Sequence, residues 1–197
     1  GPNYNVAPTQ DIYAVLEDGG VRRVESLHWG LIPFWAKEAK IGNKMINARA
    51  ETVATSGAFK HAFKKRRCII PADGFYEWKG DVPGKKQPYF IHRPDDGLFA
   101  FAGLWEHWMG PDGSEIETAL IITTESSQMI GQIHDRMPVV IDPENYETWL
   151  AGDVPDAAAL IRPASEDYFT FEATRIERNA TPPKPRVDRR ADQMKLL

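Results

Sequence analysis

Glu77 is a side chain whose type and position suit chemistry. In the segment "GFYEWK" it alternates with aromatic residues, so on a strand it shares a face with Phe75, while Tyr76 and Trp78 share the other. An apolar wall raises the pKa of a carboxyl group and suits it to general acid or base work. A structural salt bridge with an arginine explains the same pattern, and spacing alone does not separate these two interpretations.

A second group of polar side chains, His134, Asp135 and Arg136, interrupts the apolar segment "IHDRMPVVI" (133–141). Burying unpaired charge is costly, so these groups must find partners or line a wet cleft. Histidine titrates near neutral pH, which makes His134 a candidate proton carrier. A hydrogen-bonded structural histidine is the alternative.

Asn47 and Arg49 lie two residues apart in "INARAET" (46–52), so on a strand both side chains face the same way. An amide donor beside a guanidinium group is suited to binding an anion or a carbonyl oxygen. Turn capping by Asn47 and an ordinary surface position for Arg49 are the alternative.

The densest basic stretch is "KHAFKKRRC" (60–68). A solvated helix face explains it, and so does a patch that follows the phosphates of a nucleic acid. The six tryptophans are expected mainly in the core, although one or two beside such a patch can stack on unpaired bases.

Cys68 is the single cysteine, so no internal disulfide can form and a reducing, cytoplasmic setting is expected. It enters an apolar strand, and we expect it to be buried and inert. No run of about 18 apolar residues and no secretory leader is present, so no membrane contact is expected. The net charge of −4 argues against indiscriminate nucleic-acid binding but allows a local basic patch.

The sequence lacks the histidine and cysteine spacings of metal sites, the glycine loops that hold phosphates, and the G-x-S-x-G motif. We therefore expect no metal and no cofactor. Nothing demands more than a monomer.

The elements that must position these side chains are mostly strands separated by glycine-containing turns. Alternating or apolar runs predict strands over 21–31, 88–92, 98–108 and 116–124. Helices are predicted over 56–65 and over 142–152, the latter with Asp142 as N-cap and Gly152 past its end. The sequence therefore predicts one α+β domain over residues 1–178, predominantly antiparallel β, with a barrel-like sheet and a few peripheral helices. Residues 179–197 are rich in proline and charge and predict a tail, disordered or laid over the surface.

Seven segments together resemble the SRAP (SOS response-associated peptidase) family, in the family's order. They are "YNVAPTQ" (4–10), "WGLIPFWAK" (29–37), "INARAET" (46–52), "RRCIIPADGFYEW" (66–78), "PYFI" (88–91), "FAGLWE" (101–106) and "IHDRMPVVI" (133–141). The resemblance implies a barrel-like core with a positively charged cleft for single-stranded DNA. It also implies DNA repair chemistry, in which an N-terminal cysteine captures the aldehyde of an abasic site as a thiazolidine crosslink.

Site residues follow from the matching motifs. The resemblance implies catalytic roles for Asn47, Glu77 and His134. The DNA-binding candidates that it implies are Arg49, Arg136, Trp29, Asn5, Pro8, Thr9, Trp78 and Thr124.

The family's N-terminal cysteine has no counterpart among residues 1–197, which begin Gly1-Pro2-Asn3. Cys68 lacks a free α-amine and belongs to a different motif. If the sequence is the whole molecule, we expect crosslinking to fail and the cleft still to bind DNA. Non-covalent binding of single strands or junctions is therefore an alternative function. A thiol-dependent autopeptidase in the SOS response is a third, and it needs the same cysteine. If the source is bacterial, we expect the protein at the nucleoid.

Overall fold

A closed, barrel-like sheet forms the centre of the molecule in the computed structural model, which describes residues 3–80, 82 and 85–176. The barrel strands follow the order β2-β1-β4-β7-β8, and β2 pairs again with β8 to close the ring. Their bounds are β1 (Asp11–Asp18), β2 (Val21–Trp29), β4 (Arg67–Ala72), β7 (Phe99–Met109) and β8 (Glu115–Glu125). Adjacent barrel strands are antiparallel except for the closing β2–β8 pair.

The β1–β2 hairpin shows how local sequence sets this topology. Asp18 pairs with Val21, which leaves Gly19 and Gly20 as a two-residue loop. Their φ angles are 58° and 79°, in the left-handed region that glycine enters without steric cost. A loop with two such residues matches the twist of the flanking strands, so this turn fixes the hairpin's register.

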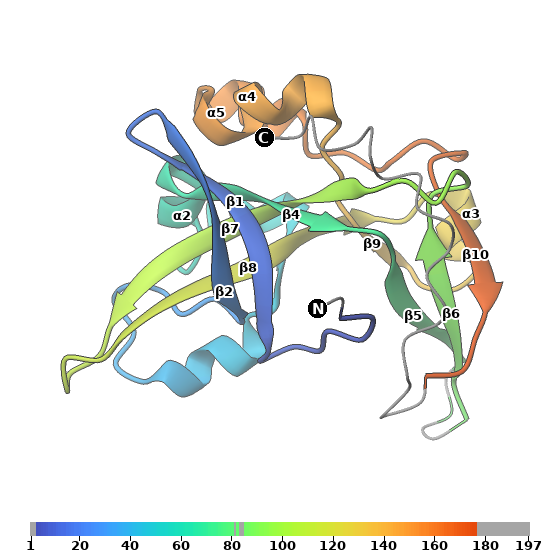
Figure 1. Ribbon diagram of the computed structural model, residues 1–197, viewed down its shortest axis with the longest axis horizontal. Helices are drawn as coiled ribbons and strands as arrows, with labels where there is room; N and C mark the ends of the chain where they lie inside the picture. Colours follow the sequence, from blue (N-terminus) through green and yellow to red (C-terminus); the bar gives the residue numbers. More distant parts are fainter. Residues whose placement is uncertain (1–2, 81, 83–84, 177–197) are drawn as a thin grey trace.

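A second, three-stranded antiparallel sheet stands beside the barrel (Figure 1). Its order is β10-β6-β5, with bounds Thr170–Ala173, Gln87–His92 and Phe75–Lys79. Two short strands extend the barrel sheet towards it: β3 (Asn47–Arg49) runs parallel to β8, and β9 (Arg136–Pro138) runs antiparallel to β8. The candidate site residues Asn47, Glu77 and Arg136 therefore all lie on strands.

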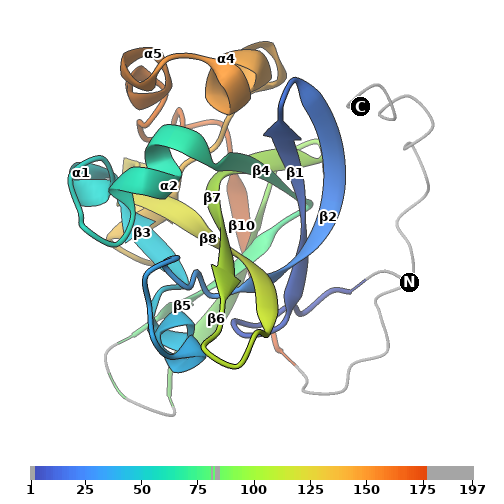
Figure 2. The same ribbon diagram turned by 90° about the vertical axis from the view of Figure 1, so that its left-hand side faces the viewer.

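Helices cover one outer face of the barrel, as Figure 2 shows at upper left. These are α1 (Ala50–Val53), α2 (Lys60–Lys65), α4 (Tyr146–Ala151) and α5 (Val154–Ala159); α3 (Gln128–Gly131) and the 3-10 helices η1 (Ala39–Lys44) and η2 (Pro143–Asn145) lie elsewhere along the chain. Phe63 and Trp149 from the helices pack against Leu120 and Ile122 of β8 in one core. The other core fills the barrel and continues beneath the second sheet.

Cys68 lies in the inner core and is fully buried. A Cβ atom added at Gly103 of β7 would come within 2.7 Å of its sulfur, so only glycine allows the two strands this approach. Burial raises the pKa of the thiol far above its ordinary value. The prediction that Cys68 is buried is confirmed.

The predicted fold class is also confirmed: the structure is α+β, mostly antiparallel, with a barrel and few helices. The helix predicted over 56–65 begins only at Lys60, and the one predicted over 142–152 divides into η2 and α4. Gly152 follows α4, as predicted, in an extended conformation with a φ of −66°. The buried guanidinium of Arg67 donates hydrogen bonds to the carbonyl oxygens of Trp149 and Gly152 at this helix end.

Within the described ranges, no helix has the length and apolar character needed to span a bilayer. The tail predicted over 179–197 lies outside these ranges.

Candidate active site

The N-terminal segment 3–10 passes between the barrel and the second sheet (Figure 1). At one end the Tyr76 hydroxyl of β5 donates to the carbonyl oxygen of Tyr4 at 3.1 Å. At the other end the Thr9 amide donates to the carbonyl of Trp29, and the Trp29 amide donates to Gln10, both at 2.9 Å. Segment 3–10 is therefore attached to both sheets.

Three predicted DNA-binding residues, Asn5, Pro8 and Thr9, lie exposed along this segment. Thr9 has a φ of 72°, which is strained for a β-branched residue. Strained backbone of this kind persists only where the surroundings impose it, and it is common at functional sites. The hydrogen bond to Trp29 supplies that constraint.

Asn47 and Arg49 both project from β3 into solvent, whereas Ala48 between them is buried in the helix-covered core. The half-buried Trp29 donates its indole N–H to the carbonyl of Ile46 at 3.0 Å. Because this bond joins the end of β2 to the start of β3, Asn47 lies next to the residues that hold segment 3–10.

Glu77 is half-buried on β5. Burial is the largest influence on its carboxyl group and raises its pKa, which electrostatic attraction to His134 and a hydrogen bond from the Trp78 amide partly offset. The structure thus brings Glu77 and His134, which are far apart in sequence, into interaction.

His134 is held by the chain that follows it. Its Nδ1 accepts a hydrogen bond from the Arg136 amide at 3.0 Å, and its side chain is 40% exposed. The same nitrogen lies 3.2 Å from the carbonyl oxygen of Arg136, so the Arg136 backbone offers Nδ1 both a donor and an acceptor, and the ring position is fixed in either tautomer. The Asp135 carboxylate is 3.4 Å from Nδ1 and can accept a hydrogen bond once that nitrogen is protonated.

The Arg136 side chain makes a two-pronged ion pair with Glu51, at 2.6 and 3.0 Å, and also donates to the carbonyl of Thr123 at 2.7 Å. This pair, together with the charge of Arg49, lowers the pKa of Glu51 from 4.5 to about 2. A phosphate offers arginine the same fork-shaped geometry as a carboxylate. Sequence analysis did not identify Glu51 as a site residue, although its position two residues after Arg49 could have indicated a role.

The side chains of two predicted residues, Trp78 and Thr124, make none of the contacts described above. Trp78 is 44% exposed and, by strand alternation, lies on the face of β5 opposite Glu77. Thr124 is buried, and with Val53 and Phe63 it lines a cavity of about 390 Å³ on the helix-covered side of the barrel. Glu51 lies at the edge of the same cavity.

The contacts of the remaining residues form a continuous path that begins and ends at segment 3–10. From Tyr4 the path runs through β5 to His134. From His134 it passes through Arg136 and Glu51 to the end of β3. Trp29 then returns it to segment 3–10. The arrangement places a carboxyl group of raised pKa and an imidazole next to two guanidinium groups, which suits proton transfer beside a bound anion. Among the residues described, no three histidine, cysteine or acidic side chains gather in a way that could hold a metal.

Comparison with known proteins defines the class of this fold and site. The profile of the SOS response associated peptidase (SRAP) family matches residues 1–180, and the chain belongs to this family. Among curated proteins it is similar to abasic site processing protein YoqW of Bacillus subtilis (strain 168), with 45% identity over 186 residues, 93% of this chain and 82% of YoqW. It is also similar to abasic site processing protein HMCES of Xenopus tropicalis, with 33% identity over 217 residues, 92% of this chain and 64% of HMCES.

Among solved structures, a protein from Bacteroides thetaiotaomicron matches with a TM-score of 0.77 and 30% identity, over 85% of this chain and 75% of that one. The predicted family membership is confirmed.

Proposed function

We propose that this protein processes abasic sites in single-stranded DNA by forming a covalent thiazolidine crosslink through an N-terminal cysteine that lies outside residues 1–197. The observation that carries the proposal is the interaction of Glu77 with His134 beside the segment that enters from the N-terminus. The names of the curated relatives support abasic sites as the target.

The chemistry needs an amine, a thiol and two proton carriers. A neutral α-amine adds to the aldehyde of the ring-opened abasic sugar, and the adduct loses water to give an iminium ion. Addition of the thiolate to the iminium carbon closes the thiazolidine ring, so the overall reaction releases one water. Glu77 supplies the proton that leaves with the hydroxyl group, because its raised pKa retains that proton closer to neutral pH.

His134 and Asn47 have orienting roles in this scheme. With Nδ1 engaged by the Arg136 backbone, His134 offers Nε2 to the adduct. Asn47, exposed at the start of β3, orients the terminal residue through its amide group.

The nucleophile cannot be Cys68. Its thiol is fully buried, burial raises its pKa, and a residue inside the chain has no free α-amine. The proposal therefore assigns binding and proton transfer to residues 1–197, and assigns the nucleophile to residues encoded ahead of Gly1.

DNA binding falls to the exposed Arg49 and to Arg136. Arg136 exchanges the Glu51 carboxylate for a DNA phosphate, a substitution between groups of matching geometry. Trp29, Asn5, Pro8 and Thr9 border the same path and are the proposed contacts to the nucleotides next to the abasic site.

The test compares residues 1–197 with a version extended by the residues encoded ahead of Gly1. Each is incubated with a single-stranded oligonucleotide carrying one abasic site and analysed on a denaturing gel. The extended protein should give a heat-stable shifted band that disappears when its terminal cysteine becomes alanine. Glu77→Gln and His134→Ala should slow the formation of this band.

Glu144→Gln, in the exposed 3-10 helix η2, is the matched control and should crosslink like the parent. A Glu77→Gln protein that crosslinks at the parent rate would contradict the assigned proton transfer. No shifted band from the extended protein would contradict the proposed reaction.

A non-covalent function is the second candidate, favoured by one observation: the only thiol between residues 1 and 197 is buried. This function predicts salt-sensitive binding of single strands or junctions without a shifted band from either protein. Autopeptidase activity, a third candidate, would appear as shortening of the extended protein's own N-terminus.

A further inference from the structure

The strand β2 has an open edge. One side of β2 pairs with β1 along its whole length up to His28, whereas the other side meets β8 only at His28 and Trp29. Over residues 21–27, no other backbone group in the described part of the chain hydrogen-bonds to that second side. An open edge of this length is a template on which another strand can form.

The two-residue turn of the β1–β2 hairpin determines which backbone groups lie on this edge. In such a hairpin the closing pair, here Asp18 and Val21, exchanges both hydrogen bonds, and pairs of this kind alternate along the strands. The residues of β2 that direct their N–H and C=O groups away from β1 are therefore Arg22, Val24 and Ser26. His28 is the next residue in this series, and β8 pairs with β2 there.

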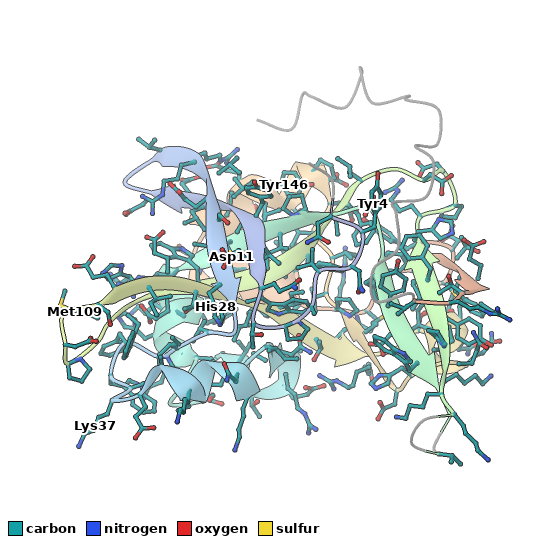
Figure 3. The ribbon with its side chains drawn as sticks, turned by 60° about the horizontal axis from the view of Figure 1, so that its bottom comes forward. Tyr4, Asp11, His28, Lys37, Met109 and Tyr146 are labelled. Atoms are coloured by element: carbon teal, nitrogen blue, oxygen red, sulfur yellow. The ribbon has the colours of Figure 1, made fainter. Side chains whose placement is uncertain are left out.

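The open edge is accessible from solvent. Figure 2 shows β2 as the outermost strand on the right-hand side of the barrel. Figure 3 labels Asp11 and His28, which pair at the end of the hairpin remote from its turn, and shows both strands running from there to the periphery of the molecule. Val21 and Val24 are 66% and 48% exposed.

The usual protection of an exposed edge is missing from β2. Proteins commonly block such an edge with a proline, a bulge or a covering element. The sequence of β2, VRRVESLHW, contains no proline, and its register with β1 runs unbroken through eight consecutive pairs. The charged residues on β2 carry both signs, so they do not repel every strand alike.

The side chains of β2 are complementary to those of a second copy of β2. An antiparallel partner centred on Val24 places the two Val24 side chains opposite each other. The same register places Arg23 opposite Glu25 of the second copy, and Val21 opposite Leu27. Opposite charges and apolar side chains that face each other directly stabilise an antiparallel pair, whereas like charges destabilise it.

The backbone groups fit the same register. With Val24 at the centre, Arg22 lies opposite Ser26 of the second copy, and all three residues direct their N–H and C=O groups outward. Each of these opposed pairs can therefore exchange both of its hydrogen bonds. A register shifted by one residue would lose this match.

Arg23 has N–H groups available for the contact. Its guanidinium lies 3.4 Å from Glu25 and 3.5 Å from Glu117, beyond the usual length of about 2.7–2.9 Å for a charge-assisted hydrogen bond. Its Nε makes no hydrogen bond within the described residues. The Glu25 side chain is 41% exposed, so it can reach the guanidinium of a second copy.

We propose that this edge joins two copies of the protein through an antiparallel β2–β2 pair with two-fold symmetry. The contact uses the same residues from each copy, as an isologous interface requires, and it merges the two barrel sheets into one. The inference goes beyond the proposed function and does not depend on it. No sequence pattern demanded more than a monomer, because self-complementarity matters only on a strand whose edge is open.

The first test measures association of residues 1–197 by sedimentation equilibrium between about 10 µM and about 1 mM, because a small interface is populated only at high concentration. The mean mass should rise with concentration from 22.2 kDa towards twice that value. In NMR amide-exchange measurements over the same range, the amides of Arg22, Val24 and Ser26 should exchange more slowly as the concentration rises. The amides of Arg23 and Glu25, which β1 already binds, should not change.

Charge reversal tests the register. Glu25→Arg places an arginine opposite Arg23 of the second copy, and Arg23→Glu places a glutamate opposite Glu25. Each variant alone should associate at least about tenfold more weakly than the parent. An equimolar mixture of the two should recover the association, because every opposed pair then carries opposite charges.

Val24→Pro tests the edge itself. The substitution removes an N–H group that points away from β1, so the β1–β2 pairing stays intact while the edge is blocked. This variant should remain monomeric over the whole range. Tyr13→Ser, at a residue of β1 that is 68% exposed and one strand away from the edge, is the matched control and should associate like the parent.

A parent protein whose mass stays at 22.2 kDa throughout would overturn the inference. Association of the Val24→Pro variant at the parent's strength would also overturn it, because the contact would then lie on another surface. A mixture of the folded charge variants that stays monomeric would rule out the two-fold register.

Discussion

Replacing Glu51 by glutamine should have opposite effects on stability and on DNA binding. Glutamine keeps the size of the side chain but removes the charge that pairs with Arg136. The folded protein then loses an ion pair. Arg136, in turn, becomes available to a phosphate without first giving up a carboxylate.

The size of the stability effect follows from the pKa of Glu51, which the Arg136 pair lowers from 4.5 to about 2. At about 1.36 kcal/mol per pKa unit, the lowered pKa would add about 3.4 kcal/mol to the free energy of unfolding if solvent did not screen the pair. The Glu51 side chain is 52% exposed, however, and solvent screens the pair, so we expect a loss of about 1 kcal/mol. A carboxyl group with a lowered pKa stabilises the fold above pH 4.5, and this contribution disappears as the pH falls through about 2.

Two measurements check this prediction. Urea unfolding at pH 7 should show the loss in free energy, and the difference between the variant and the parent should shrink as the pH falls below 4.5. Binding to a single-stranded abasic probe should become tighter at low salt, with the slope of log affinity against log salt steeper by roughly 0.7, the value for one additional phosphate contact. Glu144→Gln, at an exposed residue of η2 that takes no part in the Glu51–Arg136 pair, should change neither quantity.

Weaker DNA binding by the Glu51→Gln variant would refute this reasoning, because it would mean that the ion pair holds Arg136 in its binding position. An unchanged salt slope would show that Arg136 contacts no phosphate.

Other substitutions test the remaining features. Because burial raises the pKa of Glu77, its ionised form destabilises the fold at neutral pH. The Glu77→Gln protein should therefore unfold at a higher urea concentration than the parent at pH 8. This gain in stability should vanish below pH 4.5, where the carboxyl group is protonated in both the folded and the unfolded state. Arg67→Met should cost about 3 kcal/mol in urea unfolding, because it leaves the buried carbonyl oxygens of Phe63 and Trp149 without their donor. Thr9→Gly should relieve left-handed strain and stabilise the protein by about 1 kcal/mol in thermal unfolding, whereas Thr9→Ala should not.

Local signals in the sequence predicted β2, β6, β7 and β8 to within two residues of their bounds, whereas β1 and β10 were not predicted. The glycine turn at 19–20 and the apolar runs that became β7 and β8 depend on neighbours in the chain, so pattern alone identifies them. The closing pair β2–β8 and the parallel strand β3 depend on contacts between distant segments. No local pattern encodes such contacts. The strand and turn pattern predicted an antiparallel, barrel-like sheet but not which strands close it.

In the candidate site, too, local patterns were predictable from the sequence, whereas contacts between distant segments were not. Strand alternation put Phe75 and Trp78 on opposite faces of β5, and in the structure Phe75 packs against the inner core while Trp78 is exposed. The attachment of Glu51 to Arg136 was not foreseen, since 85 residues separate the two groups in the chain. Thr124 was a DNA-binding candidate implied by the resemblance; its side chain is buried and lines the cavity on the helix-covered side of the barrel.

Because Cys68 is fully buried against Gly103, the folded domain exposes no cysteine to thiol reagents within residues 1–197. Maleimides, iodoacetamide and mild oxidants should leave residues 1–197 unmodified until they unfold. A cysteine placed ahead of Gly1 can therefore be labelled and counted by mass spectrometry on its own, with unfolding as the only route by which a second label appears.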